Sequence, residues 1–263
     1  MFKRSSATRL LGAVSLAAGL ALALPAAHAA DATVPAHIKS AVSDAGRPDA
    51  DKQRDALRKP AESVAFAGVK AGDKVLEIMP GGGYFTRVFS KAVGDRGVVY
   101  ALAPGPRPNA PAGAPDMAAA VKAIAADPGY RNVRVGVLDP GNVKAADEPV
   151  DVVWTSLNYH DLANRSDAEL TALNKMAFDA LKPGGVYVVV DHASAAGAGK
   201  TVTRTLHRID PESVKTEVTS VGFKFDGESK VLRNDKDPHD WEVHDPNRRG
   251  TTDQFMLKFS KPK

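Results

Sequence analysis

The chain has 263 residues, of which 35 are Lys or Arg, 31 are Asp or Glu and none is Cys, and 43% are apolar. These proportions are typical of a folded globular protein and exclude the collagen-like, coiled-coil and disordered classes. The absence of cysteine excludes disulfide frameworks, thiolate zinc sites and thiol nucleophiles, so any chemistry must use histidine, carboxylates, hydroxyls or a cofactor.

Residues 1–29 have the three parts of a secretory signal peptide. Basic residues precede an apolar run from Leu10 to Leu24, and Ala27-His28-Ala29 follows as a small-x-small cleavage site. The run is shorter than the ~20 residues that a membrane span needs. We therefore expect Sec-type export with cleavage near Ala29/Ala30, no stable membrane anchor afterwards, and a periplasmic or secreted mature protein.

Charge gives no support for a nucleic-acid partner. The three basic residues of the leader account for most of the formal net charge of +4, which falls to about +1 when they are removed (4 − 3 = 1). We expect a small-molecule substrate, and the oligomeric state stays open.

After the leader, residues 30–73 are polar and mostly helical in pattern, and residues 74–263 alternate between apolar runs and amphipathic helices. Strands are predicted over residues 75–79, 98–102, 133–138, 150–157, 186–190, 223–232 and 254–259, with the principal helices over 116–126, 166–181 and 211–220. Strands that are apolar throughout indicate a parallel sheet covered on both faces. The last two strands are expected to form an antiparallel pair. We predict one α/β domain (74–263) with an N-terminal helical extension (30–73).

A glycine-rich turn, Pro80-Gly81-Gly82-Gly83, separates the first predicted strand from the helix that follows it. Such a turn lets a ligand approach the backbone and offers it helix N-terminal N–H groups. A plain tight turn would use the same residues, so the turn by itself leaves both interpretations open.

Two further features accompany the turn. Glu77 lies four residues before Gly81, and Leu181-Lys182-Pro183-Gly184-Gly185 follows downstream between a helix and a strand. With the order of the elements, these residues resemble the class I S-adenosylmethionine-dependent methyltransferases from roughly Arg54 to Phe259. Arg54-Asp55, Arg58, Pro60, Glu62, the segment from Glu77 to Tyr84 and Asp191-His192 resemble in particular a bacterial group of exported predicted methyltransferases.

The resemblance implies a Rossmann-like seven-stranded sheet of order 3-2-1-4-5-7-6 whose last strand is antiparallel. S-adenosyl-L-methionine would lie across the carboxyl ends of the first strands, at the topological switch point. The residues that the resemblance assigns to cofactor binding are Glu77, Gly81, Gly82, Gly83, Asp139 and Asn158.

The sequence departs from the pattern of this family at two places. Met79 occupies the position of the first glycine, and the second strand ends in Tyr100-Ala101-Leu102-Ala103-Pro104, without the acid that holds the ribose hydroxyls in the family. A non-catalytic ligand-binding module that kept the fold would show the same departures.

Polar clusters follow the fourth and fifth predicted strands, as Asn158-Tyr159-His160-Asp161 and Asp191-His192. Neighbouring strands lie ~4.8 Å apart, so these side chains are expected to converge on one cleft. The candidate catalytic residues are His160, His192, Asp191 and Asp161, acting as a general base with an orienting carboxylate. A metal-dependent enzyme built on the same four residues is an alternative, as is a purely structural role. The leading interpretation assigns no metal.

The sequence contains two other polar groups near the expected cleft. Arg54, Asp55 and Arg58 either close over the cleft or form an exposed salt-bridged helix face. The loop containing Asp237 to Trp241 and His244 supports no assignment. The leading hypothesis is an exported S-adenosylmethionine-dependent methyltransferase acting on an unknown small or medium-sized acceptor.

Overall fold

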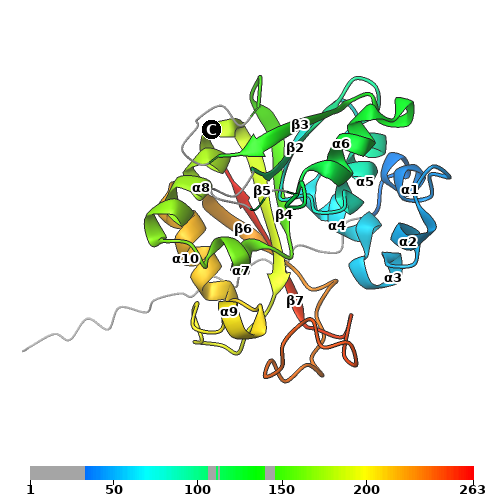
Figure 1. Ribbon diagram of the computed structural model, residues 1–263. Coiled ribbons are helices and arrows are strands. Elements are labelled where there is room, and N and C mark those ends of the chain that lie inside the picture. The colour runs from blue at the N-terminus through cyan, green and yellow to red at the C-terminus, as the bar shows by residue number, and fades with distance from the viewer. Residues whose placement is uncertain (1–32, 106–110, 112, 140–145) are drawn as a thin grey trace, which may run out of the picture.

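A seven-stranded sheet forms the centre of the molecule (Figure 1). The computed structural model describes residues 33–105, 111, 113–139 and 146–263. The strands are β1 (Lys74–Ile78), β2 (Val98–Pro104), β3 (Val133–Leu138), β4 (Val150–Ser156), β5 (Leu181–His192), β6 (Lys224–Ser229) and β7 (Gln254–Ser260). Their order is β3-β2-β1-β4-β5-β7-β6, with β7 antiparallel to β5 and β6 and the other neighbours parallel. The predicted Rossmann-like order with its antiparallel last strand is confirmed.

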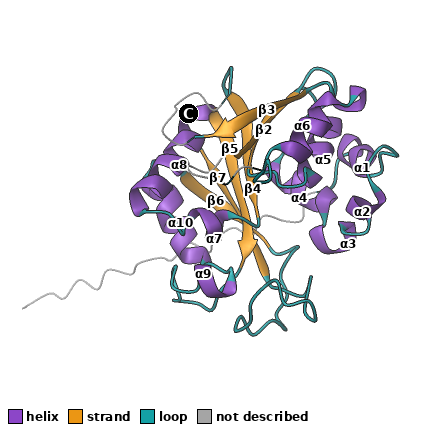
Figure 2. Cartoon of the chain, in the orientation of Figure 1, coloured by secondary structure: helices purple, strands orange, loops and turns teal. Residues whose placement is uncertain are grey.

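Helices cover both faces of the sheet (Figure 2). On one side lie α1 (Ala36–Val42), α2 (Asp49–Lys52), α3 (Asp55–Arg58), α4 (Pro60–Ala67), α5 (Tyr84–Val93) and α6 (Ala119–Ala126). On the other side lie α7 (Tyr159–Leu162), α8 (Asp167–Ala180), α9 (Thr203–Leu206) and α10 (Pro211–Ser220). A short 3₁₀ helix covers Pro128–Tyr130. Because both faces are covered, the residues of β1, β2 and β4 are mostly buried, whereas the edge strand β3 has exposed residues.

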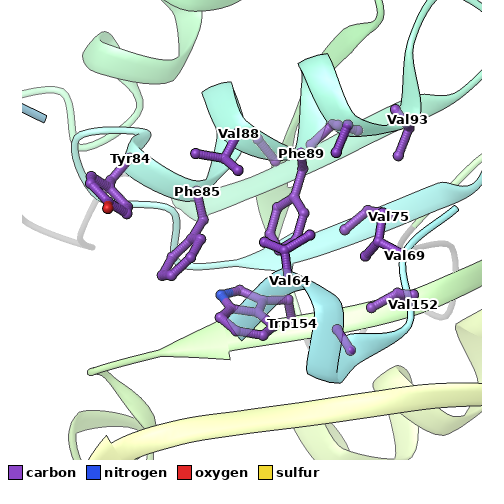
Figure 3. Close-up of a cluster of buried hydrophobic side chains, with 14 of the residues drawn as sticks. Val64, Val69, Val75, Tyr84, Phe85, Val88, Phe89, Val93, Val152 and Trp154 are labelled. Atoms are coloured by element: carbon purple, nitrogen blue, oxygen red, sulfur yellow. The ribbon is translucent and has the colours of Figure 1, made fainter. Parts of the chain in front are cut away.

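The alternation of side chains along each strand produces two cores. Val75 and Trp154 belong to the core beneath α1, α4 and α5, whereas the adjacent Leu76 and Val153 belong to the core beneath α8 and α10. Figure 3 shows the first core, in which the indole of Trp154 lies 4.8 and 5.4 Å from the rings of Phe85 and Phe89 (centroid to centroid). The aromatic rings of α5 therefore anchor that helix over β4.

Several element boundaries differ from the sequence-based prediction. β5 begins at Leu181, ahead of the expected Val186, because Leu181 already pairs with Val150 of β4. The register then shifts, with Gly184 in a left-handed conformation (φ 80°), and the regular pairing begins at Val186 and Val152. The helix α8 accordingly ends at Ala180. The strand β6 ends at Ser229 rather than at residue 232.

The structure also contains short helices that the sequence did not predict individually. The short helices α7 and α9 were not predicted, because four residues are too few to show a helical period. The N-terminal segment is divided into four helices, of which α1 and α4 contribute Ile38 and Val64 to the core shared with the sheet.

The predicted signal peptide lies outside the described residues. Among the described residues, no helix has the length and apolar character needed to cross a bilayer.

A hydrogen-bonded group of three side chains attaches the N-terminal helices to α5. The side chain of Arg47 is fully buried and donates to both carboxylate oxygens of Asp55, at 2.8 and 2.6 Å. The hydroxyl of Tyr84, the first residue of α5, donates to Asp55 at 2.5 Å, and in Figure 3 its oxygen lies at the outer end of the hydrophobic cluster. Hydrogen bonds from Arg47 and Tyr84 outweigh partial burial and lower the pKa of Asp55.

We expect Asp55→Ala to lower the free energy of unfolding by about 3 kcal/mol or more, because it leaves the buried guanidinium of Arg47 without its carboxylate. Asp49→Ala is the control, since Asp49 is 93% exposed and its pair with Lys52 is long, at 3.5 Å. That change should cost about 1 kcal/mol or less. Urea unfolding of both variants measures the difference, and equal losses would show that the buried pair does not hold the extension.

Candidate functional site

The turn after β1 has a sharply bent backbone. Met79, Gly81 and Gly83 all take left-handed conformations, with φ of 54°, 54° and 77°. A Cβ atom at Gly83 would lie 2.1 Å from Cδ1 of Ile124 on α6, so only glycine allows the two helices to pack here. Met79 therefore keeps the backbone conformation that a glycine in the same position would adopt, despite its side chain.

The other side of the turn is open. A Cβ atom on Gly81 or Gly82 would meet nothing within 4 Å, and both residues are exposed. The turn lies where β1 is flanked by β2 on one side and β4 on the other, which is the topological switch point of the sheet. The backbone of the turn is thus accessible to a ligand at the place where open α/β sheets bind one.

Glu77, on β1, is buried beneath the turn, with 3% of its surface exposed. Its carboxyl group accepts a hydrogen bond from Thr86 Oγ1 at 2.5 Å. Burial raises the pKa of Glu77 to about 7, against the opposing effects of the Thr86 hydrogen bond and the charges of Arg58 and Arg87. A carboxyl group with this pKa is partly protonated near neutral pH.

Asn158 and Asp139, the two other residues assigned to the cofactor, have different surroundings. Asn158 is buried, donates to the carbonyl oxygen of Met79 at 3.0 Å and accepts a short hydrogen bond from Thr155. Its polar atoms thus brace the glycine turn against the end of β4. Asp139 is exposed at the carboxyl end of β3, on the same edge of the sheet.

Beside the glycine turn lies a cleft of ≈ 590 Å³ between the N-terminal helices, the ends of β4, β5 and β7, and the loop of residues 230–253. In Figure 1 this loop (orange to red) lies below the sheet, next to α9. The lining residues are Arg54, Leu57, Arg58, Leu157, His160, Asp161, His192, Val243, His244, Arg249, Gly250, Thr252 and Gln254. The predicted convergence of the polar residues after β4 and β5 is therefore observed, and Arg54 and Arg58 lie at the same cleft.

Asp191, at the end of β5, is fully buried and orients His160. One carboxylate oxygen accepts hydrogen bonds from His160 Nδ1 (2.8 Å) and the backbone N–H of His192 (2.7 Å). The other accepts the backbone N–H of His160 at 2.7 Å. A carboxylate is acceptor-only, so Nδ1 of His160 carries the proton and the lone pair of its neutral form is on Nε2.

The two histidines that the sequence predicted for the cleft, His160 and His192, differ in basicity. Burial opposes the charged form of His160, but the Asp191 carboxylate more than compensates, so the pKa of His160 is raised. Burial lowers the pKa of His192 to about 4, although Asp191 acts in the opposite direction. His192 is thus neutral at pH 7, with its Nδ1 2.9 Å from Thr252 Oγ1, and His160 is the stronger base.

Two histidines that the sequence reasoning did not select also reach this cluster. The ring of His207, which follows α9, stands edge-on to His160 at 5.5 Å and lies 4.8 Å from the ring of His244. The only signal in the sequence was the polar character of the loop that contains His244. The neighbouring Arg208 is fully buried and pairs with Asp237 at 2.7 Å. Because it also donates to the carbonyl oxygen of Ala193 at 2.9 Å, it joins the loop of residues 230–253 to the residue that follows β5.

Arg58 is a partly buried guanidinium at the boundary between the turn and the cleft. It stacks on the rings of Tyr84 and Phe85, 4.7 and 5.1 Å from their centroids, and donates to Ser156 Oγ at 3.2 Å. Burial lowers the pKa of Arg58. It pairs with no carboxylate among the described residues, so its charge is free to bind an anion there.

Glu77→Gln should change how stability depends on pH. Because the folded-state pKa of about 7 exceeds the ordinary value of 4.5, protonated Glu77 stabilises the fold below pH 4.5, and this stability is lost as the pH rises through 7. The variant should therefore gain up to about 3 kcal/mol relative to the parent chain between pH 4.5 and 8. Urea unfolding at a series of pH values measures this gain.

Glu169→Gln is the control of opposite sign, because hydrogen bonds from Ser166 lower the pKa of the exposed Glu169. That carboxylate contributes stability that is lost as the pH falls, so its removal should weaken the fold at neutral pH rather than strengthen it. A Glu77→Gln difference that stays constant over the whole pH range would contradict the raised pKa.

Comparison with known proteins identifies the fold. No protein-family model and no curated protein matches the chain. An S-adenosylmethionine-dependent methyltransferase from Aquifex aeolicus matches with a TM-score of 0.55 and 17% identity, over 81% of this chain and 97% of that one. A glycopeptide N-methyltransferase complexed with S-adenosyl-L-methionine matches with a TM-score of 0.52 and 17% identity, over 77% and 86% of the chains.

A protein described as a [4+2]-cyclase also matches, with a TM-score of 0.53 and 15% identity, over 84% of this chain and 85% of that one. The same fold therefore carries more than one reaction. These comparisons show that the chain has the fold of the S-adenosylmethionine-dependent methyltransferases.

Proposed function

We propose that the chain is an S-adenosylmethionine-dependent methyltransferase that acts on a small or medium-sized acceptor. The observation that carries the proposal is the open backbone at Gly81 and Gly82, at the switch point of this fold and directly beside a polar cleft. The turn is suited to the methyl donor and the cleft to the acceptor, and Arg58 lies between them.

Arg58 is suited to the carboxylate of the donor. It contacts the first residues of α5 and the end of β4, and so lies against the turn that would hold the amino-acid portion. A guanidinium presents a planar fork of donors that fits a carboxylate. The proposal therefore adds Arg58 to Glu77, Gly81, Gly82 and Gly83 as a residue that holds the donor.

The adenosine portion fits a second pocket of ≈ 590 Å³ at the ends of β2 and β3. Met117 and Val137 line it, and both are unusually exposed for apolar residues, at 59% and 63%. Covering them with a flat ring would remove apolar surface from water. Asp116 is the carboxylate that lines this pocket, where it accepts hydrogen bonds from Lys122 (2.8 Å) and the backbone N–H of Ala118 (2.9 Å).

When bound, S-adenosyl-L-methionine supplies an electrophilic methyl group: its S–CH₃ bond breaks, a bond to the acceptor forms, and the acceptor loses one proton. The chain must therefore align the acceptor and promote the loss of that proton. We propose His160 as the residue that activates the acceptor, with Asp191 orienting it and with His192 and Asp161 lining the same space. The raised pKa of His160 favours it over His192 in this role.

Export of the mature protein, to the periplasm or beyond the cell, is a further part of the proposal. It rests on the charged, apolar and small-residue segments of residues 1–29. The presence of Met79 in place of a glycine does not indicate that the donor site has been lost, because the backbone of Met79 keeps a left-handed conformation like that of a glycine. Met79 therefore does not favour a non-catalytic binding module over the transferase, and titration with the donor tests whether the absence of an acid at Ala103 does.

Gly82→Leu tests the donor site. Calorimetric titration of the purified chain with S-adenosylmethionine and S-adenosylhomocysteine should show one site of micromolar affinity. The leucine side chain would project into the open space beside the turn and weaken both affinities by about 10- to 100-fold, while the urea midpoint stays unchanged. If the folded parent chain binds neither compound up to millimolar concentration, the transferase proposal fails.

Arg58→Gln tests the assignment of the donor carboxylate. Loss of a charge-assisted hydrogen bond of ~1.5–3 kcal/mol should weaken S-adenosylmethionine binding by about 10- to 100-fold. Decarboxylated S-adenosylmethionine is the matched probe: it should bind the parent chain and Arg58→Gln with similar affinity. An equal loss for both ligands would mean that Arg58 acts on the shape of the site and not on the carboxylate.

A further inference from the structure

We propose that His160, Asp161 and His207 form a binding site for a divalent transition-metal ion in the acceptor cleft. One atom from each residue, a ring nitrogen or a carboxylate oxygen, lies within 4.8 Å of the other two. His160 Nε2 and His207 Nδ1 are 3.6 and 3.8 Å from the same oxygen of Asp161. Ligand atoms ~2.0–2.1 Å from a zinc ion at angles of ~109–120° lie roughly 3.3–3.6 Å apart, so small side-chain movements would complete the site.

The hydrogen bonding of His160 prepares it as a ligand. Its Nδ1 proton is donated to the buried carboxylate of Asp191, which leaves the lone pair of Nε2 directed toward Asp161. Metal-binding histidines are held in this way by a carboxylate on their other nitrogen. His160 and Asp191 together are thus two parts of such an arrangement, and the ion would be the third.

His207 provides an independent observation. Its Nδ1 is buried and has no hydrogen-bond partner among the described residues, although its Nε2 lies 3.9 Å from Glu242. An unpaired buried ring nitrogen costs free energy unless a ligand satisfies it. His207 also has a left-handed backbone (φ 55°), a strained conformation that persists where the surroundings enforce it. The nitrogen that lacks a partner is the one that faces Asp161.

The ligand set differs from the set of four that the sequence suggested for a metal enzyme. Asp191 is excluded because both of its oxygens accept hydrogen bonds from His160 and the backbone. His192 contacts Thr252 through Nδ1, and its ring centre is 6.2 Å from that of His160. Two imidazoles and one carboxylate form a borderline ligand set, suited to Zn²⁺, Fe²⁺, Co²⁺ or Ni²⁺ rather than to Mg²⁺ or Ca²⁺.

Three protein ligands leave coordination positions free for a further ligand from the cleft. An ion there would bind the acceptor's oxygen, nitrogen or sulfur and lower the pKa of the bound group, so that its proton passes to water before methyl transfer. His160 would then activate the acceptor as a ligand of the ion. This role rests on the proposed transferase function, whereas the binding of the ion does not.

The first test is metal titration of the full chain, prepared without a histidine tag and freed of metal by a chelator. Calorimetry with Zn²⁺ should show one ion per chain, and Co²⁺ should develop the strong visible absorption of a four- or five-coordinate site. An absence of stoichiometric Zn²⁺ binding, or a Co²⁺ spectrum like that of the ion in water, would overturn the proposal.

Variants locate the site. His207→Gly removes the imidazole and suits the left-handed backbone, and Asp161→Asn keeps the shape of an exposed side chain, so both should fold normally. Each should weaken Zn²⁺ binding by more than about 100-fold, beyond the 10- to 100-fold loss typical of an outer hydrogen-bond partner. His37→Ala is the control. His37 lies on α1, contacts the carbonyl oxygen of Val69 and belongs to neither group of potential ligands among the described residues, so its removal should not alter the affinity for Zn²⁺. Unchanged Zn²⁺ affinity in both site variants would refute the assignment.

Titration with S-adenosylmethionine separates this inference from the proposed function. His207→Gly should bind S-adenosylmethionine as the parent chain does, because the donor site lies at the glycine turn. Zn²⁺ binding that depends on His207 and Asp161 supports the metal site even if S-adenosylmethionine does not bind. Conversely, S-adenosylmethionine binding without any Zn²⁺ binding rejects the metal site and leaves the transferase proposal standing.

Discussion

The buried carboxylate of Asp191 is the constraint on which the polar site depends. An ionised carboxylate inside a protein must have its lone pairs satisfied, and Asp191 accepts one side-chain and two backbone N–H groups. All of these donors come from the segments that directly follow β4 and end β5. The carboxylate thereby joins two neighbouring strands at the edge where the cleft opens, and it fixes the orientation and tautomer of His160. The proposed activation of an acceptor by His160, as a base or as a metal ligand, would use Nε2, the nitrogen that this arrangement leaves available.

A second buried charge has the corresponding effect on the other side of the cleft. Arg47 is enclosed by the N-terminal helices and is neutralised by Asp55, which also receives the hydroxyl of Tyr84. Since Tyr84 begins α5 directly after Gly83, the N-terminal helices are attached at the glycine turn itself. Arg58, three residues after Asp55, is thereby placed against Tyr84 and Phe85 with its charge unpaired by any described carboxylate. The extension thus forms part of the wall of the site and contributes a cation to it.

The sequence predicted the sheet well because most strands contain a short run rich in apolar residues and the longer helices show a clear period. It also predicted that residues after β4 and β5 meet, since parallel strands end at one edge. It could not predict the contributions of His207 and Thr252, because their positions depend on contacts between distant segments. The buried pair of Arg208 and Asp237 holds the loop of residues 230–253 next to the end of β5. The residues around Arg208 and Asp237 in the sequence show no pattern that predicts this ion pair. The hydrogen bonds of Asn158 to Met79 and Thr155 were likewise not evident from the sequence, and its assignment to the cofactor stays a prediction.

Two non-glycine residues with left-handed backbones, Met79 and Leu157, lie at the edge of the sheet where the polar cleft opens. Met79 follows β1 and Leu157 follows β4, and both take left-handed conformations (φ 54° and 59°) that cost branched or bulky residues about 1–2 kcal/mol each. Each residue still donates its N–H to a neighbouring strand, Met79 to Leu102 and Leu157 to Val190, before the chain turns away. The two strands that flank the switch point therefore end abruptly at the same level and leave space above them. The side chains of Met79 and Leu157 each pack against one of the two hydrophobic cores, and these contacts offset part of the backbone strain. Leu157 also lines the cleft itself, so the strained end of β4 contributes an apolar side chain to the space in which the proposed acceptor would bind.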